Sequence, residues 1–248
     1  MLGLPDGTRA CLFDLDGVLT DTASVHAAAW KQMFDDYLKL RAERDGTPFQ
    51  EFDVKADYGP YVDGRPRLDG TRGFLASRGI ELPEGGPDDP PDAETIYALS
   101  TRKNDLVQEK IKTVGVDVYP GSVTYLEAVK AAGLRTACVS SSANAEQVLD
   151  ITGLAQYIDH RVDGVVARER GLPGKPAPDT FLAAAADLGV AEEDAVVFED
   201  ATAGVASGRA GGFGFVVGVD RVGHRDDLLK NGADVVVDDL AELLEVPS

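Results

Sequence analysis

The amino-acid sequence predicts an α/β fold in which a doubly wound parallel sheet is interrupted by an inserted α-helical domain. Short apolar runs alternate with helical patterns at the start and in the second half of the chain. This alternation is typical of a parallel sheet covered by helices on both faces. About a hundred residues between the first two apolar runs contain no convincing strand. The chain has 248 residues, of which 44% are hydrophobic, enough for one large domain or two modest ones.

The first expected strand is ACLFD, at residues 10–14, and three helical patterns follow it in the insertion. These three helices are expected at ASVHAAAWKQMFDDYLKLRAER, RLDGTRGFLASRG and DAETIYALSTRKNDLVQEKIKTVG. The later strands are expected at TACVS, AVVFED, FGFVVG and ADVVV. The helices between them are expected at SVTYLEAVKAAG, NAEQVLDITG, PDTFLAAAADLG and DDLLKNG. This order predicts a Rossmann-like core.

The insertion divides the expected domains. We expect a core of residues 1–22 and 118–248 and a helical cap of residues 23–117, entered near Thr22 and left near the turn-forming VDVYPGS. The two connections would act as one hinge. Within the cap, LPEGGPDDPPDAET reads as a surface loop that ends in a helix N-cap.

Composition excludes several classes of function. The formal charge of -19 argues against binding to nucleic acid or to an anionic membrane surface, although a few local cations can still bind a small anion. The sequence has no apolar stretch of membrane-spanning length and no signal-like start, so we expect a cytoplasmic protein. Cys11 and Cys138 lie in apolar strand patterns and predict no disulfide framework. No protein partner can be inferred.

Acidic residues follow two of the expected strands. Asp14 ends the first strand and Asp16 lies just after it, and Glu199 and Asp200 end AVVFED. The carboxyl ends of parallel strands border the ligand crevice of an open sheet. Carboxylates brought together there repel each other unless a cation intervenes, which favours a hard divalent ion such as Mg²⁺. The alternative for Asp14 and Asp16 is that they only end a strand and begin a turn.

Two further segments have features of a phosphate site. VSSS, at 139–142, ends a strand at the same edge, and the helix expected near Asn144 offers N–H groups to an anion. Lys175 lies in GKPAPDT, just before another helix start. A lysine alone is usually solvated, but beside a metal and a hydroxyl-rich loop it is a plausible cation for phosphoryl transfer.

In chain order, DLDGVLTDT, VSSS, GKPAPD and VFEDATAG resemble the haloacid dehalogenase superfamily, and within it the β-phosphoglucomutase-like subgroup with a helical cap. The resemblance covers essentially the whole chain. It implies that Asp14 is the nucleophile and that Asp16 is the general acid and base. It also implies that Asp14, the Asp16 carbonyl and Asp200 hold Mg²⁺, with Glu199 binding directly or through water.

The resemblance implies substrate contacts as well. Ser140 and Lys175 would bind the transferred phosphate, Asp21 would support the turn, and Arg67 would clamp a second phosphate. The other substrate-binding residues that it implies are Thr22, His26, Trp30, Gly64, Lys103, Ser141, Ser142 and Asn144.

Some cap residues also have structural interpretations. His26 and Trp30 could simply pack in a helix. Arg65 is additional to the G-x-x-R pattern and could be a solvated loop charge.

Ala143, in the expected core, stands where the subgroup usually has a lysine. Losing a charged hydrogen bond of roughly 1.5 to 3 kcal/mol weakens the case for a bisphosphate substrate.

Three functions are therefore compared. The first is a mutase that interconverts β-glucose 1-phosphate and glucose 6-phosphate through an aspartyl-phosphate and a 1,6-bisphosphate. The second is a Mg²⁺-dependent phosphatase of a sugar phosphate or similar small phosphomonoester, which Ala143 favours. The third is a signalling module in which Asp14 is a phosphoacceptor. The helical insertion and the Asp16 carboxylate, which serves turnover, argue against the third function.

Overall fold

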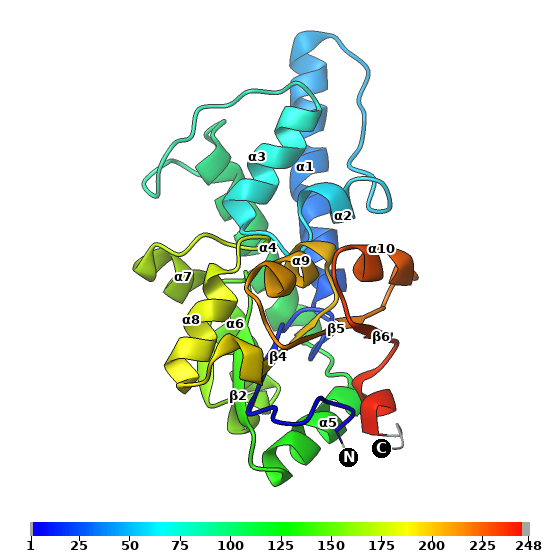
Figure 1. The fold of residues 1–248 in the computed structure, drawn as a ribbon. Helices are drawn as coiled ribbons and strands as arrows, with labels where there is room; N and C mark the ends of the chain where they lie inside the picture. The colour runs from blue at the N-terminus through cyan, green and yellow to red at the C-terminus, as the bar shows by residue number, and fades with distance from the viewer. Residues whose placement is uncertain (1, 245–248) are drawn as a thin grey trace. The chain divides into compact units, whose positions relative to one another are not determined.

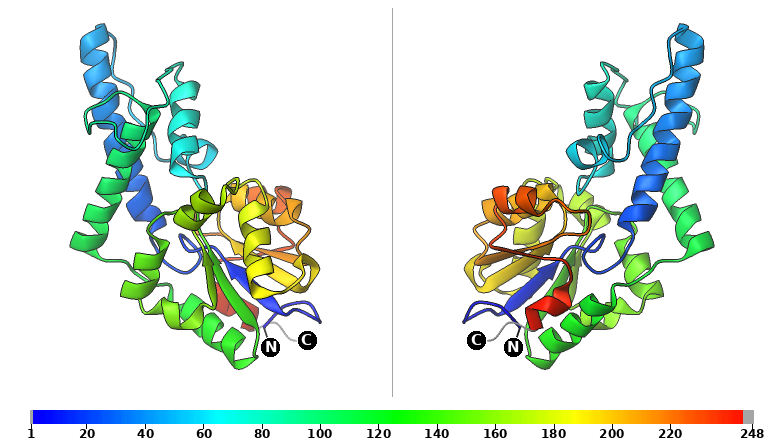
Figure 2. Two further views of the ribbon diagram at one scale, coloured as in Figure 1. Left: turned by 90° about the vertical axis from the view of Figure 1, so that its left-hand side faces the viewer. Right: turned by 90° about the vertical axis from the view of Figure 1, so that its right-hand side faces the viewer.

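The computed structural model describes residues 2–244, in two compact units (Figures 1 and 2). The core unit comprises residues 1–22 and 116–248, and the helical unit comprises residues 23–115. The second boundary thus lies two residues before the expected one at 117. The reason is local, because the Asp21 N–H donates to the Asp117 carbonyl at 2.9 Å and the Tyr119 N–H donates to the Leu19 carbonyl at 3.2 Å. These bonds join residues 116–119 to the loop after the first strand.

Within the described residues, the core unit contains a six-stranded sheet in which all neighbouring strands are parallel (Figure 1). This arrangement confirms the predicted doubly wound α/β fold. In spatial order the strands are β3 (His160–Val162), β2 (Arg135–Val139), β1 (Ala10–Phe13), β4 (Ala195–Glu199), β5 (Phe215–Val219) and β6 (Val235–Val237). Only β3 was not expected. It is a three-residue edge strand with one fully buried side chain, too short to show a period of two.

The core helices lie between these strands in the sequence. They are α5 (Pro120–Ala131), α6 (Ala145–Ile151), α7 (Gly164–Arg170), α8 (Asp179–Leu188), α9 (Thr202–Ala210) and α10 (Arg225–Lys230). Short 3₁₀ turns are η1 (Leu154–Tyr157), η2 (Glu192–Asp194) and η3 (Leu240–Leu244). Helices α7 and α9 were missed. Glycine weakens the helical pattern of α9, and the packing requires it, because a Cβ on Gly208 would approach Val197 and Val216 to 3.2 Å.

The strands bury both faces, as a parallel sheet must. On one face, Phe13 stacks on Phe198 with 4.5 Å between ring centroids, and Tyr125 of α5 lies edge-on to both rings. On the other face, Val197 joins the cluster formed by Phe181 of α8 with residues of α9 and α10. Side chains alternate along a strand, so Glu199, two residues after Val197, points toward α8 and α9.

The helical unit has its own aromatic core. Its helices are α1 (Ala23–Asp45), α2 (Tyr58–Tyr61), α3 (Arg67–Ser77) and α4 (Ile96–Val114). Phe34 stacks on Trp30 and on Phe52, with ring centroids 5.2 and 5.3 Å apart, and contacts Phe74 at 4.2 Å. Among the described residues, no helix is long and apolar enough to cross a membrane.

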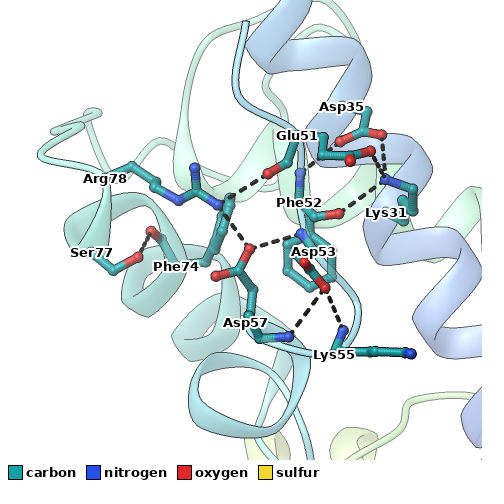
Figure 3. Close-up of polar contacts among 11 residues, drawn as sticks. Lys31, Asp35, Glu51, Phe52, Asp53, Lys55, Asp57, Phe74, Ser77 and Arg78 are labelled. Carbon is teal, nitrogen blue, oxygen red and sulfur yellow. Dashed lines mark hydrogen bonds and ion pairs between the residues drawn. The ribbon is translucent and has the colours of Figure 1, made fainter.

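A polar network fixes the segment between α1 and α2 (Figure 3). Lys31 of α1 donates to Asp35 at 2.9 Å, to Glu51 at 2.7 Å and to the Phe52 carbonyl at 3.0 Å. Asp35 also accepts the Phe52 N–H at 2.8 Å. Arg78, the residue that follows α3, donates to the Glu51 carbonyl and to Asp57. The segment is therefore held by both helices.

Candidate active site

The candidate site lies at the carboxyl ends of β1, β2 and β4. The Asp14 N–H donates to the Phe198 carbonyl at 2.9 Å, so Asp14 continues the ladder between β1 and β4, and the residue is 5% exposed. Lys175 donates to this carboxylate, to Glu199 Oε1 at 2.6 Å and to the Val139 carbonyl at 3.0 Å. Its ammonium also lies 4.8 Å from the centroid of the Phe181 ring. The lysine therefore connects the ends of all three strands.

The carboxylates around Lys175 outnumber its single positive charge. Burial is the main cause that raises the pKa of Asp14 well above its ordinary value; Lys175 opposes it, and Glu199 and Asp16 add to it. Burial acts to lower the pKa of Lys175, but Asp14 and Glu199 outweigh burial and raise that pKa. One buried ammonium thus faces several carboxylates. The site lacks positive charge that a divalent cation could supply.

The Asp16 carboxylate is held by hydroxyl groups. Its Oδ1 accepts a hydrogen bond from Thr22, whose hydroxyl also lies 2.9 Å from that of Thr20. Its Oδ2 accepts from Ser140 at 3.3 Å. These hydroxyl donors orient both oxygens of the carboxyl group. This environment suits a general acid and base.

The serine loop folds on its own hydroxyl groups. The Ser142 N–H donates to Ser140 Oγ at 3.0 Å, and the Asn144 N–H donates to Ser142 Oγ at 3.1 Å. Ser140, Ser142 and Asn144 are buried, whereas Ser141 and Ala143 are partly exposed. The structure therefore brings Ser140 to Asp16, while Asn144 is the residue before α6.

Asp200 packs against the turn after β1. Gly17 has φ of +87°, and a Cβ on this residue would lie 1.8 Å from Asp200 Oδ2. Any side chain at position 17 would displace the Asp200 carboxylate, so glycine is required for this approach as well as for its φ angle. Gly17 belongs to the same turn as Asp14 and Asp16, which places Asp200 beside that turn.

Only a few of the expected oxygen ligands are oriented so that they could bind a hard metal ion. Among the described residues, no three acidic, histidine or cysteine side chains are arranged as a metal site. Glu199 instead binds Lys175 through Oε1 and the Ala201 N–H through Oε2 at 2.7 Å. With Asp16 turned to hydroxyl groups, the expected ligands reduce to the side chains of Asp14 and Asp200 and one backbone carbonyl. That set is compatible with Mg²⁺, which keeps several waters and uses one or two carboxylates.

Three of the expected cap residues meet within the helical unit. Lys103 Nζ lies 2.9 Å from His26 Nδ1 and 4.7 Å from the centroid of the Trp30 ring. An ammonium has no acceptor, so His26 Nδ1 accepts and the proton of the neutral imidazole is on Nε2. Lys103 is 5% exposed. Gly64, with φ of +66°, lies in the turn before α3, and Arg67 is the first residue of that helix.

Sequence reasoning missed contacts that depend on the backbone or on distant elements. The Val139 carbonyl and the Ala201 N–H carry no residue-type signal, although each binds a site side chain. Arg221 donates to the Gly17 carbonyl and His224 to the Asp200 carbonyl, both at 2.9 Å. Both lie in a turn after β5 that none of the quoted motifs includes.

The chain is similar in sequence and in structure to known proteins. The family model of haloacid dehalogenase-like hydrolases matches residues 8–212. The β-phosphoglucomutase of Mycobacterium bovis is 59% identical over 247 residues, covering 98% of this chain and 94% of that protein. Hexitol phosphatase A of Escherichia coli is 31% identical, covering 82% of this chain and 80% of its own length. The crystal structure of β-phosphoglucomutase from Clostridium difficile has a TM-score of 0.75 at 28% identity, covering 95% of this chain and 93% of that one.

Proposed function

The chain belongs to the family of haloacid dehalogenase-like hydrolases, and from this premise we propose that it is a β-phosphoglucomutase acting on β-glucose 1-phosphate and glucose 6-phosphate. Its relatives make it an enzyme of the phosphotransferase and phosphatase class, which sets aside the signalling module. The observation that carries the choice of substrate is the 59% identity, over nearly the full length, with the M. bovis β-phosphoglucomutase.

The proposed reaction begins at Asp14. A carboxylate oxygen of Asp14 attacks the phosphorus of the bisphosphate, the bond between phosphorus and the sugar oxygen breaks, and Asp16 gives its proton to that oxygen. The aspartyl-phosphate then passes its phosphoryl group to the 6-hydroxyl of β-glucose 1-phosphate, while Asp16 takes the hydroxyl proton. Turnover of the new 1,6-bisphosphate in the opposite orientation releases glucose 6-phosphate and restores the phosphoenzyme.

The surrounding residues support this chemistry. Lys175 keeps the Asp14 carboxylate in place and adds positive charge beside the transferred group, and Ser140 and Thr22 orient Asp16. We assign Mg²⁺ to Asp14, the Asp16 carbonyl and Asp200, where it would offset charge on the phosphoryl oxygens. Glu199 would act on that site through Lys175.

Further substrate contacts are proposed within each unit. In the helical unit, we propose that Arg67 binds a phosphate bidentately and that His26, Trp30 and Lys103 act as one group. In the core unit, we propose that Ser142 and Asn144 bind phosphate. Ser141 and Gly64 complete the proposed contacts. A cytoplasmic location is proposed because Cys11 and Cys138 are free and buried, as in reducing compartments.

A product assay tests the proposal. The chain is incubated with Mg²⁺, β-glucose 1-phosphate and a trace of glucose 1,6-bisphosphate, and glucose 6-phosphate and free phosphate are both measured. We expect glucose 6-phosphate with little free phosphate, loss of activity in EDTA, and recovery on adding Mg²⁺. Release of phosphate without glucose 6-phosphate would contradict the mutase.

A phosphatase of small sugar phosphates is the second candidate. Ala143 favours it, since the subgroup usually has a lysine there, and hexitol phosphatase A is among the relatives. Water would then replace the sugar hydroxyl as the acceptor from Asp14. A panel of phosphomonoesters with phosphate release as the readout distinguishes the two functions.

A further inference from the structure

The turn after β5 contacts both loops that we expect to hold the metal. We call residues 220–224 the β5 turn. Asp220 shapes it, because its Oδ1 accepts the N–H groups of Val222, Gly223 and His224 at 3.3, 2.7 and 2.9 Å. Its Oδ2 accepts the N–H of Arg225 at 3.1 Å. These hydrogen bonds fix the backbone of the β5 turn, from which the side chains of Arg221 and His224 extend.

From this turn, Arg221 extends to the loop after β1. Its Nε donates to the Gly17 carbonyl at 2.9 Å, and its Nη1 donates to the Asp238 carbonyl at 2.7 Å. The guanidinium carbon lies 3.6 Å from the centroid of the Tyr119 ring, which supports it from below. One guanidinium thus links the loop after β1 to the segment after β6.

His224 makes the second connection, to the loop after β4. Its Nε2 lies 2.9 Å from the Asp200 carbonyl oxygen. A carbonyl oxygen can only accept, so the imidazole Nε2 carries a hydrogen and donates it. One turn therefore holds the backbone of two separate loops, one ending β1 and the other ending β4.

The two carbonyls belong to residues that touch each other. A Cβ on Gly17 would overlap the Asp200 carboxylate at 1.8 Å, so any shift of either backbone changes how Asp200 lies beside the turn of Asp14 and Asp16. The β5 turn thus holds the backbone of both loops that carry the expected side-chain ligands, Asp14 and Asp200.

We propose that Arg221 and His224 are positioning residues that hold these two loops at the separation Mg²⁺ binding requires. The inference rests on the metal site of the proposed function. Mg²⁺ demands near-ideal octahedral geometry at about 2.0–2.1 Å, so it tolerates little displacement of its ligands. Groups that orient metal ligands from behind typically change metal affinity about 10- to 100-fold when removed.

Titration calorimetry of Mg²⁺ into the full, substrate-free chain tests the proposal. We expect Arg221→Ala and His224→Ala each to weaken Mg²⁺ binding about 10- to 100-fold. Arg225→Ala is the matched control. Arg225 follows the same turn and donates to the Val236 carbonyl and to Asp238, but to neither Gly17 nor Asp200. Its replacement should leave Mg²⁺ affinity unchanged.

Conservative variants separate positioning from folding. His224→Gln keeps an N–H donor and should bind Mg²⁺ more tightly than His224→Ala, and Arg221→Lys carries the test if Arg221→Ala does not fold. Thermal unfolding without metal verifies that each variant is folded. Folded Arg221 and His224 variants with wild-type Mg²⁺ affinity, or equal weakening by Arg225→Ala, would overturn the inference. If the unaltered chain binds no Mg²⁺, the proposed metal site falls with it.

Discussion

At the scale of single residues, Lys175 determines how two carboxylates can be buried together. Its side chain is 1% exposed and contacts Asp14 and Glu199, of which Glu199 is equally buried. An ion pair in such a place gains little net stability, because desolvation of the charges offsets their attraction. Removing one partner is different, since the remaining charge is then buried without compensation.

Replacing Lys175 by methionine should therefore destabilise the core unit by about 3–5 kcal/mol. The reason is the uncompensated charge on Asp14 and Glu199, so the double variant Lys175→Met, Glu199→Gln should lose less than the sum of the two single variants. Urea unfolding at pH 7 without metal measures all four proteins. A single Lys175→Met variant as stable as the unaltered chain would show that the carboxylates do not depend on this lysine.

Replacing Asp14 by asparagine should lower phosphoryl transfer at least about 10³-fold, because the amide is a poor nucleophile. The same variant should no longer take up phosphate on the protein, which mass spectrometry of the rapidly quenched enzyme detects. Asp21→Asn is the control, as Asp21 is exposed and lies in the same loop. Substantial turnover by the Asp14→Asn protein would remove Asp14 from its proposed role.

At the scale of elements, the sequence predicts strands and helices that have a regular apolar pattern, and it misses elements whose residues are set by packing against another element. Strands β1, β2, β4, β5 and β6 are buried apolar runs, and such runs are visible without a partner. Helix α9 was missed because Gly204 must be small: a Cβ there would lie 1.7 Å from Glu199 Oε1. Gly204 lowers the helix propensity of α9, and it is needed because the Glu199 side chain of β4 packs against it.

The same limit applies to the site. Motif spacing brought Asp14, Lys175 and Glu199 to one sheet edge, because strand ends and the switch-point rule are readable from the chain. It could not show that Glu199 binds Lys175 and a backbone N–H, since its orientation depends on the packing of α8 and α9. Arg221 and His224 were missed for the related reason that they act on backbone carbonyls.

The turn before α3 carries an arginine with an unused donor. Arg65 is half-buried, and its Nε is buried without a hydrogen-bond partner in the described part of the chain. A guanidinium with such a donor is suited to bind an anion.

Arg65→Ala should therefore weaken binding of glucose 1,6-bisphosphate about tenfold or more, the equivalent of one charged hydrogen bond. Glucose 6-phosphate should be affected less, because it has one phosphate fewer to bind. Calorimetry with both sugars measures the difference, and Arg168→Ala, which removes an exposed arginine of α7, is the control. Equal losses for both sugars, or none, would return Arg65 to the role of a loop charge.

At the scale of the whole molecule, the excess of acids is accommodated by fixing some of them with donors. Asp159 accepts Lys130 at 2.7 Å and the Thr136 N–H at 2.9 Å. Burial acts to raise the pKa of Asp159, but Lys130 and Thr136 together lower it below its ordinary value. Burial also acts to raise the pKa of Asp220, but the N–H groups of the β5 turn outweigh burial and lower that pKa. Such groups make stability depend on pH.

The sign of that dependence follows from the proton count. A carboxyl group whose pKa is lower in the folded chain contributes stability above its unfolded pKa, about 3.9, and loses it as the pH falls through the folded pKa. Asp159→Asn should therefore cost about 1 kcal/mol at pH 7, and its difference from the unaltered chain should shrink below about pH 4, where protonated aspartate resembles asparagine. Urea unfolding between pH 7 and the acid range measures this difference, with Asp150→Asn, on the exposed side of α6, as a control that should change little. A deficit of the Asp159→Asn protein that stays constant with pH would show that the charge of Asp159 contributes nothing to stability.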